Sequence, residues 1–371
     1  MRLVSLDLRH FRNYSTLHLD LGAGVNILFG RNAAGKTNVL EGIFFLATSR
    51  SHRTHQDQDL ITWGEDDLAV GALLDSGYGQ IHAEIRYQRD KRRQIRLGGS
   101  QVRVVDLLGR VPVVFFGPDD LQMLKGSPAL RRRYLDLFLS QTHPPYFKAL
   151  QSYVHVVTQR NGLLRQLREG GGTAGTLEVW DDQFIEYATT VTHYRLQALG
   201  PVQARAAESQ QQLSEGREKL TLTYEFAAGG EPQDPAAIRD RLQTALAERR
   251  REELSRAQTT VGPHRDDLLI RINGVDARSF GSQGQQRSAV LSLKLAELGY
   301  LRQEAGTNPL LLLDDVTSEL DDGRRGLLLE AVGREAQTFI TCTTLDDLDP
   351  RWLESSHLHR VEAGEIRPYG R

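Results

Sequence analysis

The chain has 371 residues, of which 25% are charged and 39% are hydrophobic, and its formal net charge at pH 7 is −2. This length is enough for two domains, or for one large α/β domain with an insertion. The balanced charge excludes a protein that is basic over its whole surface, so nucleic-acid binding would depend on local positive patches. No apolar run approaches the ~18 residues of a membrane span, and the first residues show no leader pattern. We therefore expect a cytoplasmic protein without a membrane partner.

The N-terminal third reads as a series of strands interrupted by one helix. Alternating apolar residues predict strands at residues 3–8 and 16–21, and an apolar run predicts a buried strand at residues 25–29. A glycine-rich turn and a helix over residues 38–47 follow. Further strands are predicted at residues 68–73, 81–87, 94–97 and 111–116.

The glycine-rich turn fits the phosphate-loop pattern G-x-x-x-x-G-K-[S/T] at every fixed position. Its residues are Gly30, Arg31, Asn32, Ala33, Ala34, Gly35, Lys36 and Thr37. Between a strand and a helix, such a turn points backbone N–H groups at phosphate oxygens. We predict that Lys36 holds the β- and γ-phosphates of a nucleotide and that the Thr37 hydroxyl binds Mg²⁺. A glycine turn that joins strand and helix by chance is the alternative.

Helical periodicity predicts mainly helices in the middle of the chain. Ser127 and Pro128 form a typical helix start, and His143-Pro144-Pro145 predicts the end of that helix. Another helix is expected over residues 150–164, a hinge or loop at residues 170–172, and a separate polar helix beyond Gly200-Pro201. A strand at 220–226 and a helix at 235–256 complete the region. We expect short helices, because no heptad pattern of a long coiled coil is sustained.

A second nucleotide motif lies near the C-terminus. Four leucines at residues 310–313 precede Asp314 and Asp315, as expected of a central parallel strand whose carboxyl end meets the nucleotide. We predict that Asp314 binds Mg²⁺ and that Asp315 orients or deprotonates the attacking water. An ordinary buried strand end is the alternative. Residues 318–321 are expected to form a turn that leads into a helix. Cys342 is expected to lie in a buried strand at residues 338–342.

Residues 279–287 place glycines and small polar side chains before another predicted helix, which makes a second anion site. The segment resembles the signature motif of ABC-type ATPases. Ser282, Gly284 and Gln285 match its serine, second glycine and glutamine, whereas Gly281 and Gln283 depart from it. The resemblance implies that Ser282 reaches across a dimer to the γ-phosphate of the partner's nucleotide. An ordinary helix cap is the alternative.

Two other positions depart from the ABC pattern. The residue after the Mg²⁺-binding aspartate is usually a glutamate, but here it is Asp315, which is one methylene shorter. Slow turnover is the expected consequence. Thr343 and Thr344 stand where many relatives have a switch histidine, and their role stays open.

Four segments are similar to motifs of the RecF family, and the resemblance spans the whole chain. They are Pro118–Leu121 with Lys125–Pro128 and Arg131–Asp136, Gly262–Leu268, Gly281–Arg287 and Leu312–Asp321. The resemblance implies an α/β fold: an ABC-type, Rad50-like ATPase head with an inserted, mostly helical lobe and no long coiled coil. We place the ATPase lobe at residues 1–117 and 259–371, and the inserted lobe at residues 118–258.

The same resemblance implies an activity. The protein would use ATP and Mg²⁺, form an ATP-induced homodimer on DNA, and hydrolyse ATP slowly as a timer. It would bind duplex DNA and single-strand/duplex junctions, and with RecR and RecO it would help load a recombinase at gapped DNA. The ATPase subunit of a membrane transporter and an ABC head coupled to a nuclease are the alternatives from other classes.

Arginines are the remaining candidate contacts. By resemblance to Rad50-like and SMC heads, Arg53 is the preferred phosphate contact within one chain, with a solvated loop as the alternative. Arg12 is a candidate contact to adenine or its phosphates, unless it only forms a turn.

The basic residues at 89–96 and 249–251 either meet the DNA backbone or form solvated faces. Residues 131–133 either serve the family motif or pair with Asp119, Asp120 or Asp136. No compact base-reading motif appears, so DNA recognition is expected through phosphates and shape.

Overall fold

The computed structural model describes residues 2–171, 174–315, 336–348, 350–353 and 356–370, together with residues 324, 326 and 328. The turn predicted at residues 318–321, and Gly172 of the predicted hinge, lie outside the described residues. The chain divides into two units: Met1–Asp120 with Glu297–Arg371, and Leu121–Ala296. The sequence-based division placed residues 259–296 with the ATPase lobe. In the structure they belong to the second unit, where β10 (Asp267–Ile272) pairs with β9 (Leu220–Glu225).

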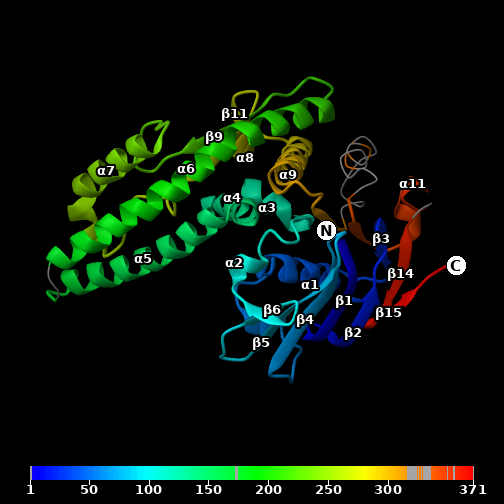
Figure 1. Ribbon diagram of the computed structural model, residues 1–371. Helices are drawn as coiled ribbons and strands as arrows, with labels where there is room; N and C mark the ends of the chain where they lie inside the picture. Colours follow the sequence, from blue (N-terminus) through cyan, green and yellow to red (C-terminus); the bar gives the residue numbers. More distant parts are fainter. Residues whose placement is uncertain are drawn as a thin grey trace. The chain divides into compact units, whose positions relative to one another are not determined.

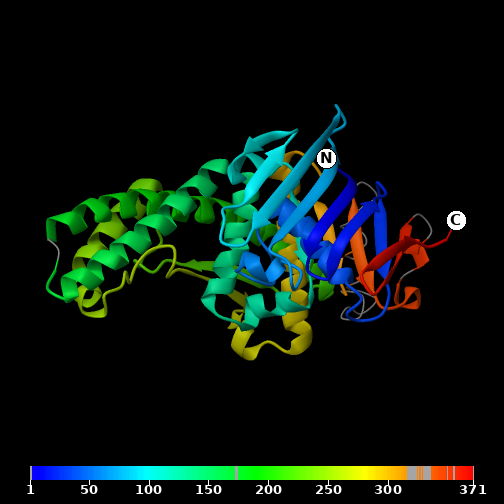
Figure 2. The ribbon, with the colours of Figure 1, turned by 90° about the horizontal axis from the view of Figure 1, so that it is seen from below.

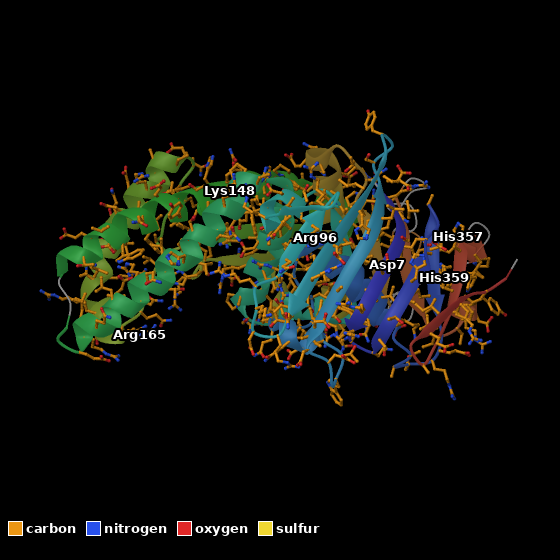
Figure 3. The ribbon with its side chains drawn as sticks, turned by 60° about the horizontal axis from the view of Figure 1, so that its bottom comes forward. Asp7, Arg96, Lys148, Arg165, His357 and His359 are labelled. Carbon is orange, nitrogen blue, oxygen red and sulfur yellow. The ribbon has the colours of Figure 1, made fainter. Side chains whose placement is uncertain are left out.

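An antiparallel sheet forms from the N-terminal part of the first unit (Figure 2). In β1, Leu6 and Leu8 are buried while Arg9 is exposed, which is the alternation that the sequence predicts. Asp7 lies on the same strand (Figure 3). The strand order is β2 (Tyr14–Asp20), β1 (Arg2–Phe11), β4 (Asp67–Asp75), β5 (Gln80–Gln88), β6 (Gln94–Leu97) and β7 (Ser100–Val102), and these bounds confirm five of the predicted strands.

A second, mainly parallel sheet carries the nucleotide motifs. Its order is β15 (Glu365–Pro368), β14 (His357–Glu362), β3 (Val25–Phe29), β13 (Thr338–Cys342), β12 (Leu310–Asp314) and β8 (Val113–Phe116). All neighbours run parallel except β14 and β15. The carboxyl ends of β3, β13, β12 and β8 therefore share one edge of the sheet. Cys342 is buried at the end of β13, as predicted.

Helix α1 (Lys36–Thr48) follows the phosphate loop and packs against strands of both sheets. Every residue from Val39 to Thr48 is buried, including Glu41. A helix buried on all sides is fixed by its packing rather than by its own propensity. The first unit also contains the short elements η1 (Asp57–Leu60), α2 (Val104–Leu107), η2 (Pro118–Asp120), η4 (Leu345–Asp347) and α11 (Pro350–Leu353).

The second unit is mostly helical, and its helices α5 and α6 lie side by side (Figure 1). A sheet of three strands in the order β11 (Val275–Asp276), β10 and β9 packs against α6 through β9. The helices are α3 (Leu121–Lys125), α4 (Pro128–Thr142), α5 (Pro144–Arg168), α6 (Ala174–Leu213), α7 (Pro235–Arg256) and α8 (Ala277–Phe280), and α9 (Gln283–Ala305) begins here. No helix among the described residues has the length and apolar character that a membrane span needs.

Prolines mark one predicted boundary and fail to mark another. His143 ends α4 and precedes α5, whose first turn contains Pro144 and Pro145, so that predicted break is confirmed. The helix start expected beyond Gly200-Pro201 is wrong, because α6 runs through Pro201 and reaches 40 residues. Ala198, Val202 and Ala206 form a buried stripe at this point. The packing of this stripe outweighs the backbone hydrogen bond that Pro201 cannot donate. Because the helix continues through Pro201, α6 is longer than the short helices we expected.

Candidate nucleotide-binding site

The turn after β1 holds the phosphate loop in shape. Gly35 has φ +115°, and a Cβ atom there would lie 2.6 Å from Asn13 Nδ2 and 2.7 Å from Tyr14 Oη, so only glycine fits. Tyr14 Oη donates a hydrogen bond to the Gly35 carbonyl (3.1 Å), and Asn13 Nδ2 donates to the Ala34 carbonyl (3.3 Å). These contacts preorganise the loop that the sequence predicts.

Lys36 lies inside the loop. Its Nζ donates hydrogen bonds to the carbonyl oxygens of Gly30 (2.6 Å) and Arg31 (2.9 Å). Burial lowers the pKa of the ammonium group, and the negative charge of Asp315 opposes that shift. The lysine is therefore a positive charge held at the centre of the loop.

A cavity of about 560 Å³ opens beside Lys36, within the first unit. Its volume is in the range of ~300–1,000 Å³ that is typical of small-molecule sites. The lining comes from the phosphate loop, α1, the segment after α1 and the shared edge of the parallel sheet: Asn32, Ala33, Gly35, Lys36, Thr37, Asn38, His52, Arg53, Phe115, Pro118, Asp119, Asp314, Asp315 and Thr341. The structure thus brings Lys36, Thr37, Arg53, Asp314 and Asp315 together, as predicted.

Asp314, at the end of β12, accepts hydrogen bonds from α1 and from β13. Its Oδ1 accepts hydrogen bonds from Thr37 Oγ1 (2.9 Å) and from Thr341 Oγ1 (2.7 Å). Burial raises the pKa of Asp314, the two hydroxyl donors lower it, and the neighbouring Asp315 raises it further. A buried carboxylate beside a hydroxyl group matches the oxygen ligands that Mg²⁺ prefers.

Asp315 adopts an unusual backbone conformation. Its φ is +50°, a left-handed conformation that is uncommon outside glycine, and its N–H donates to Thr341 Oγ1 at 2.9 Å. Such strain persists where surrounding contacts fix it, and it is often found at functional sites. Thr341 therefore contacts the carboxylate of Asp314 and the backbone of Asp315, and the cavity lining includes it rather than Thr343 or Thr344.

The two candidate arginines differ in position. Arg53 lines the cavity, and its Nη1 donates to Asn38 Oδ1 at 3.0 Å. Arg12 forms a turn with φ +55°, and its guanidinium donates to both carboxylate oxygens of Glu41 (2.8 Å each) and to the Asp59 carbonyl (2.8 Å). The contact of Arg12 with a nucleotide stays a prediction, since its side chain is not part of the cavity lining.

The signature residues lie in the second unit, at the start of α9. Ser282 N–H donates to Gln285 Oε1 (2.9 Å), and Gln285 N–H donates to Ser282 Oγ (3.3 Å). This is the reciprocal cap of a helix N-terminus. The cap interpretation thus describes the geometry within one chain, and the contact of Ser282 with a partner's nucleotide stays a prediction.

Arginines of both predicted basic runs form ion pairs within the chain. Arg89 pairs with Asp66 and Arg93 with Asp57, while Arg250 pairs with Asp181. Two family motifs meet through Arg131, which makes a buried, two-pronged ion pair with Asp267 (2.8 Å for each bond). Pairing therefore explains Arg131, although the partner is Asp267 rather than Asp119, Asp120 or Asp136.

Sequence reasoning missed several residues of the cavity, namely Asn38, His52, Phe115, Asp119 and Thr341. The rings of His52 and Phe115 stack with centroids 3.9 Å apart. For Asp119 a signal was available, because it follows β8, and β8 is the parallel neighbour of β12. Placing both strands in one sheet would have put their carboxyl ends at one edge.

The comparisons agree with this geometry. A family model described as RecF/RecN/SMC N terminal domain matches residues 2–350. The chain is 45% identical to the DNA replication and repair protein RecF of Symbiobacterium thermophilum, over 99% of this chain and 98% of that one. The chain belongs to the RecF family. The RecF protein of Heliobacterium modesticaldum is 42% identical, over 99% of each chain.

Solved structures confirm the predicted fold class of this RecF family member. A structure of the recombination mediator protein RecF with ATP superposes with a TM-score of 0.92 at 33% identity, covering 99% of this chain and 97% of that one. An Smc head bound to the winged-helix domain of ScpA gives a TM-score of 0.54 at 15% identity, which shows a shared fold alone. The chain is therefore an α/β ATPase head of the SMC type with a helical second unit.

Proposed function

We propose that the chain is an ATP-dependent DNA-binding protein of recombinational repair and replication restart. The observation that carries this proposal is the hydrogen bond between Thr37 and Asp314, which joins the phosphate loop to the end of β12. Their contact beside a cavity for a small ligand supports binding of a nucleoside triphosphate. The related RecF structure with ATP supports ATP as that nucleotide.

Each group of the site has a proposed role. Lys36 and Arg53 supply positive charge to the phosphates, and Asp315 orients the attacking water. The Thr37 hydroxyl and the Asp314 carboxylate would hold Mg²⁺, which neutralises phosphate charge when bound. Because the side chain of Asp315 is short, we propose slow hydrolysis that acts as a timer.

A homodimer induced by ATP is part of the proposal. Ser282, Gly284 and Gln285 would complete the nucleotide site of the partner chain. A serine hydroxyl has one donor and two acceptor positions, and the helix cap uses Ser282 Oγ as an acceptor. The cap is therefore compatible with donation of the hydroxyl hydrogen to a phosphate oxygen.

Contacts with DNA would come from dispersed cations. Helix α5 contains no acidic residue, and its exposed Lys148 and Arg165 lie toward opposite ends of the helix (Figure 3). We propose that such residues bind phosphates of duplex DNA and of single-strand/duplex junctions, with affinity that falls as salt rises. By family membership we extend the proposal to a cytoplasmic role with RecR and RecO in recombinase loading at gapped DNA. The transporter and nuclease alternatives are not proposed, because the full-length relatives are DNA replication and repair proteins.

Sedimentation with ATP, ADP or no nucleotide, each with and without duplex DNA, tests the proposal. We expect a heavier species with ATP, and binding to DNA that depends on ATP. Lys36→Met should abolish both effects, because the lysine faces the β- and γ-phosphates. Lys219→Met, which removes an exposed lysine of the second unit, is the matched control. ATP-dependent DNA binding that survives in Lys36→Met would overturn the assignment.

A further inference from the structure

Glu41, in the middle of α1, is a fully buried carboxylate outside the described lining of the nucleotide cavity. Arg12 donates to both of its oxygens, and the Ser51 hydroxyl donates to one of them. Burial alone would raise the pKa of Glu41, but the hydrogen bonds from Arg12 and Ser51 outweigh it and hold the pKa below its ordinary value. Glu41 is therefore a charged anchor inside the first unit.

Ser51 connects this anchor to the backbone of the cavity wall. Its Oγ accepts the N–H groups of Arg53 (2.9 Å) and Thr54 (3.1 Å). The donation of its hydroxyl hydrogen to Glu41 points the oxygen lone pairs toward these N–H groups. The backbone position of Arg53 thus depends on the carboxylate of Glu41.

The Arg53 side chain completes the connection. Its Nη1 donates to Asn38 Oδ1 (3.0 Å) and lies 3.6 Å from Glu41 Oε2, and the side chain lines the cavity with Lys36. Arg12 engages Glu41 in a two-pronged pair, which is the strong geometry for a guanidinium and a carboxylate. Arg53 forms only this longer ion pair with Glu41 and its side chain stays 44% exposed, so its charge can also act on a ligand in the cavity.

We propose that Glu41 is a positioning residue for ATP binding, which acts through Ser51 to hold Arg53 at the cavity wall. Arg12 is then the counterion of Glu41 and not a contact to the nucleotide. This inference rests on the proposed ATP site. It differs from a purely structural role for Glu41 because it predicts energetic coupling between Ser51 and Arg53.

A double-mutant cycle on ATP affinity tests the coupling. Titrations of a fluorescent ATP analogue would use the full chain as wild type, Ser51→Ala, Arg53→Ala and the double variant. We expect each single change to weaken binding about tenfold, which is the scale of one charge-assisted hydrogen bond. The double variant should bind no more weakly than Arg53→Ala. Two losses that multiply in the double variant would overturn the proposal.

Ser76→Ala is the matched control. Ser76 Oγ also accepts a backbone N–H in a turn of the first unit, from Tyr78 at 3.3 Å, but it lies in the β4–β5 hairpin. We expect wild-type affinity for this variant. If Ser51→Ala also binds like wild type, the inference fails while the proposed function stands. If the wild type itself does not bind ATP, the proposed function fails.

A second pair of variants separates positioning from charge compensation. Glu41→Gln should weaken ATP binding like Ser51→Ala and also lower stability, because it leaves Arg12 without its carboxylate. Glu41→Gln with Arg12→Gln should recover stability but not ATP affinity. Recovery of ATP affinity in the double variant would show that Glu41 only compensates Arg12, and would overturn the proposal.

Discussion

Thr37 and Asp314 are joined by a hydrogen bond of 2.9 Å, although 277 positions separate them in the chain. Thr37 lies in the first turn of α1 and Asp314 ends β12, so one short contact connects the two nucleotide motifs. Thr341 donates to the same oxygen of Asp314 at 2.7 Å. The carboxylate is thus held from two sides before it meets a ligand, which is the preorganisation that catalytic sites need.

Thr341→Val should impair both stability and turnover. The substitution removes a hydroxyl that bonds to Asp314 and to the N–H of Asp315, and the loss of a hydrogen bond to a charged group costs about 2 kcal/mol. We expect ATPase turnover to fall about tenfold as Asp315 loses its support. Urea unfolding and ATPase assays measure the two effects.

Thr338→Val is the control, since its hydroxyl bonds only to the Ala336 carbonyl among the contacts described for it. Equal behaviour of the two variants would contradict this role of Thr341.

Asp315→Asn should separate ATP binding from hydrolysis. Asp314 remains, so ATP should still bind, while turnover should fall about a hundredfold if Asp315 orients the attacking water as proposed. The DNA-bound dimer should then last longer, which sedimentation or dissociation kinetics would detect. Asp90→Asn provides a matched control, because Asp90 also has a positive φ (+62°) but lies in an exposed turn. Hydrolysis at the wild-type rate in Asp315→Asn would assign the water to another residue.

The stability of the first unit should fall in mild acid because of His359, which lies on β14 (Figure 3). Burial lowers the pKa of His359 to about 4, from an ordinary value of 6.5. As the pH falls, His359 is protonated at a higher pH in the unfolded chain than in the folded one. The contribution of neutral His359 to the free energy of unfolding is therefore present above pH 6.5 and is lost as the pH falls toward 4. About 2 kcal/mol should disappear between pH 7.5 and pH 5.

Urea unfolding of wild type and His359→Leu at pH 7.5 and pH 5 measures the contribution of His359 to the free energy of unfolding. The free-energy difference between the two proteins should change by about 2 kcal/mol across the interval. His82→Leu removes an exposed histidine of β5 and serves as the control. A difference that stays constant with pH would show that His359 does not carry the effect.

Asp267→Asn should destabilise the second unit. The change breaks the buried pair with Arg131, and removing one partner of such a pair costs about 3–5 kcal/mol. Glu252→Gln breaks the exposed pair with Arg256 in α7 and should cost less than about 0.5 kcal/mol. Urea unfolding compares the two variants. A loss for Asp267→Asn no larger than that of the control would mean that the two family motifs are held together by other contacts.

The sequence predicted those parts of the site that depend on local structure. The strand, glycine turn and helix around Lys36 are encoded by consecutive residues, and so is the buried strand that ends at Asp314. Thr341 was out of reach, because its role arises from the pairing of β13 with β12, which no local pattern reveals. Glu41 likewise reads as an ordinary helical residue until Arg12 and Ser51 are seen to surround it.

Packing between distant segments also explains the errors. Pro201 has a strong local tendency to end a helix, yet the buried stripe that includes Val202 keeps α6 continuous. The pairing of Arg93 with Asp57, which lies 36 positions away in the sequence, was likewise beyond what a local pattern reveals, and contact of this basic run with DNA stays a prediction.

We propose that each nucleotide is bound between Lys36 of one chain and Ser282 of its partner. Mixing Lys36→Met protomers with Ser282→Arg protomers tests it, with Ser279→Arg as a control for a new arginine near the signature segment. In the heterodimer both lesions fall in one site, and the other site pairs an intact Lys36 with an intact Ser282. We predict that ATPase activity, absent from each variant alone, reappears on mixing. A mixture that stays inactive and traps no intact nucleotide, although a tag pull-down in ATP verifies the heterodimers, would contradict the shared site.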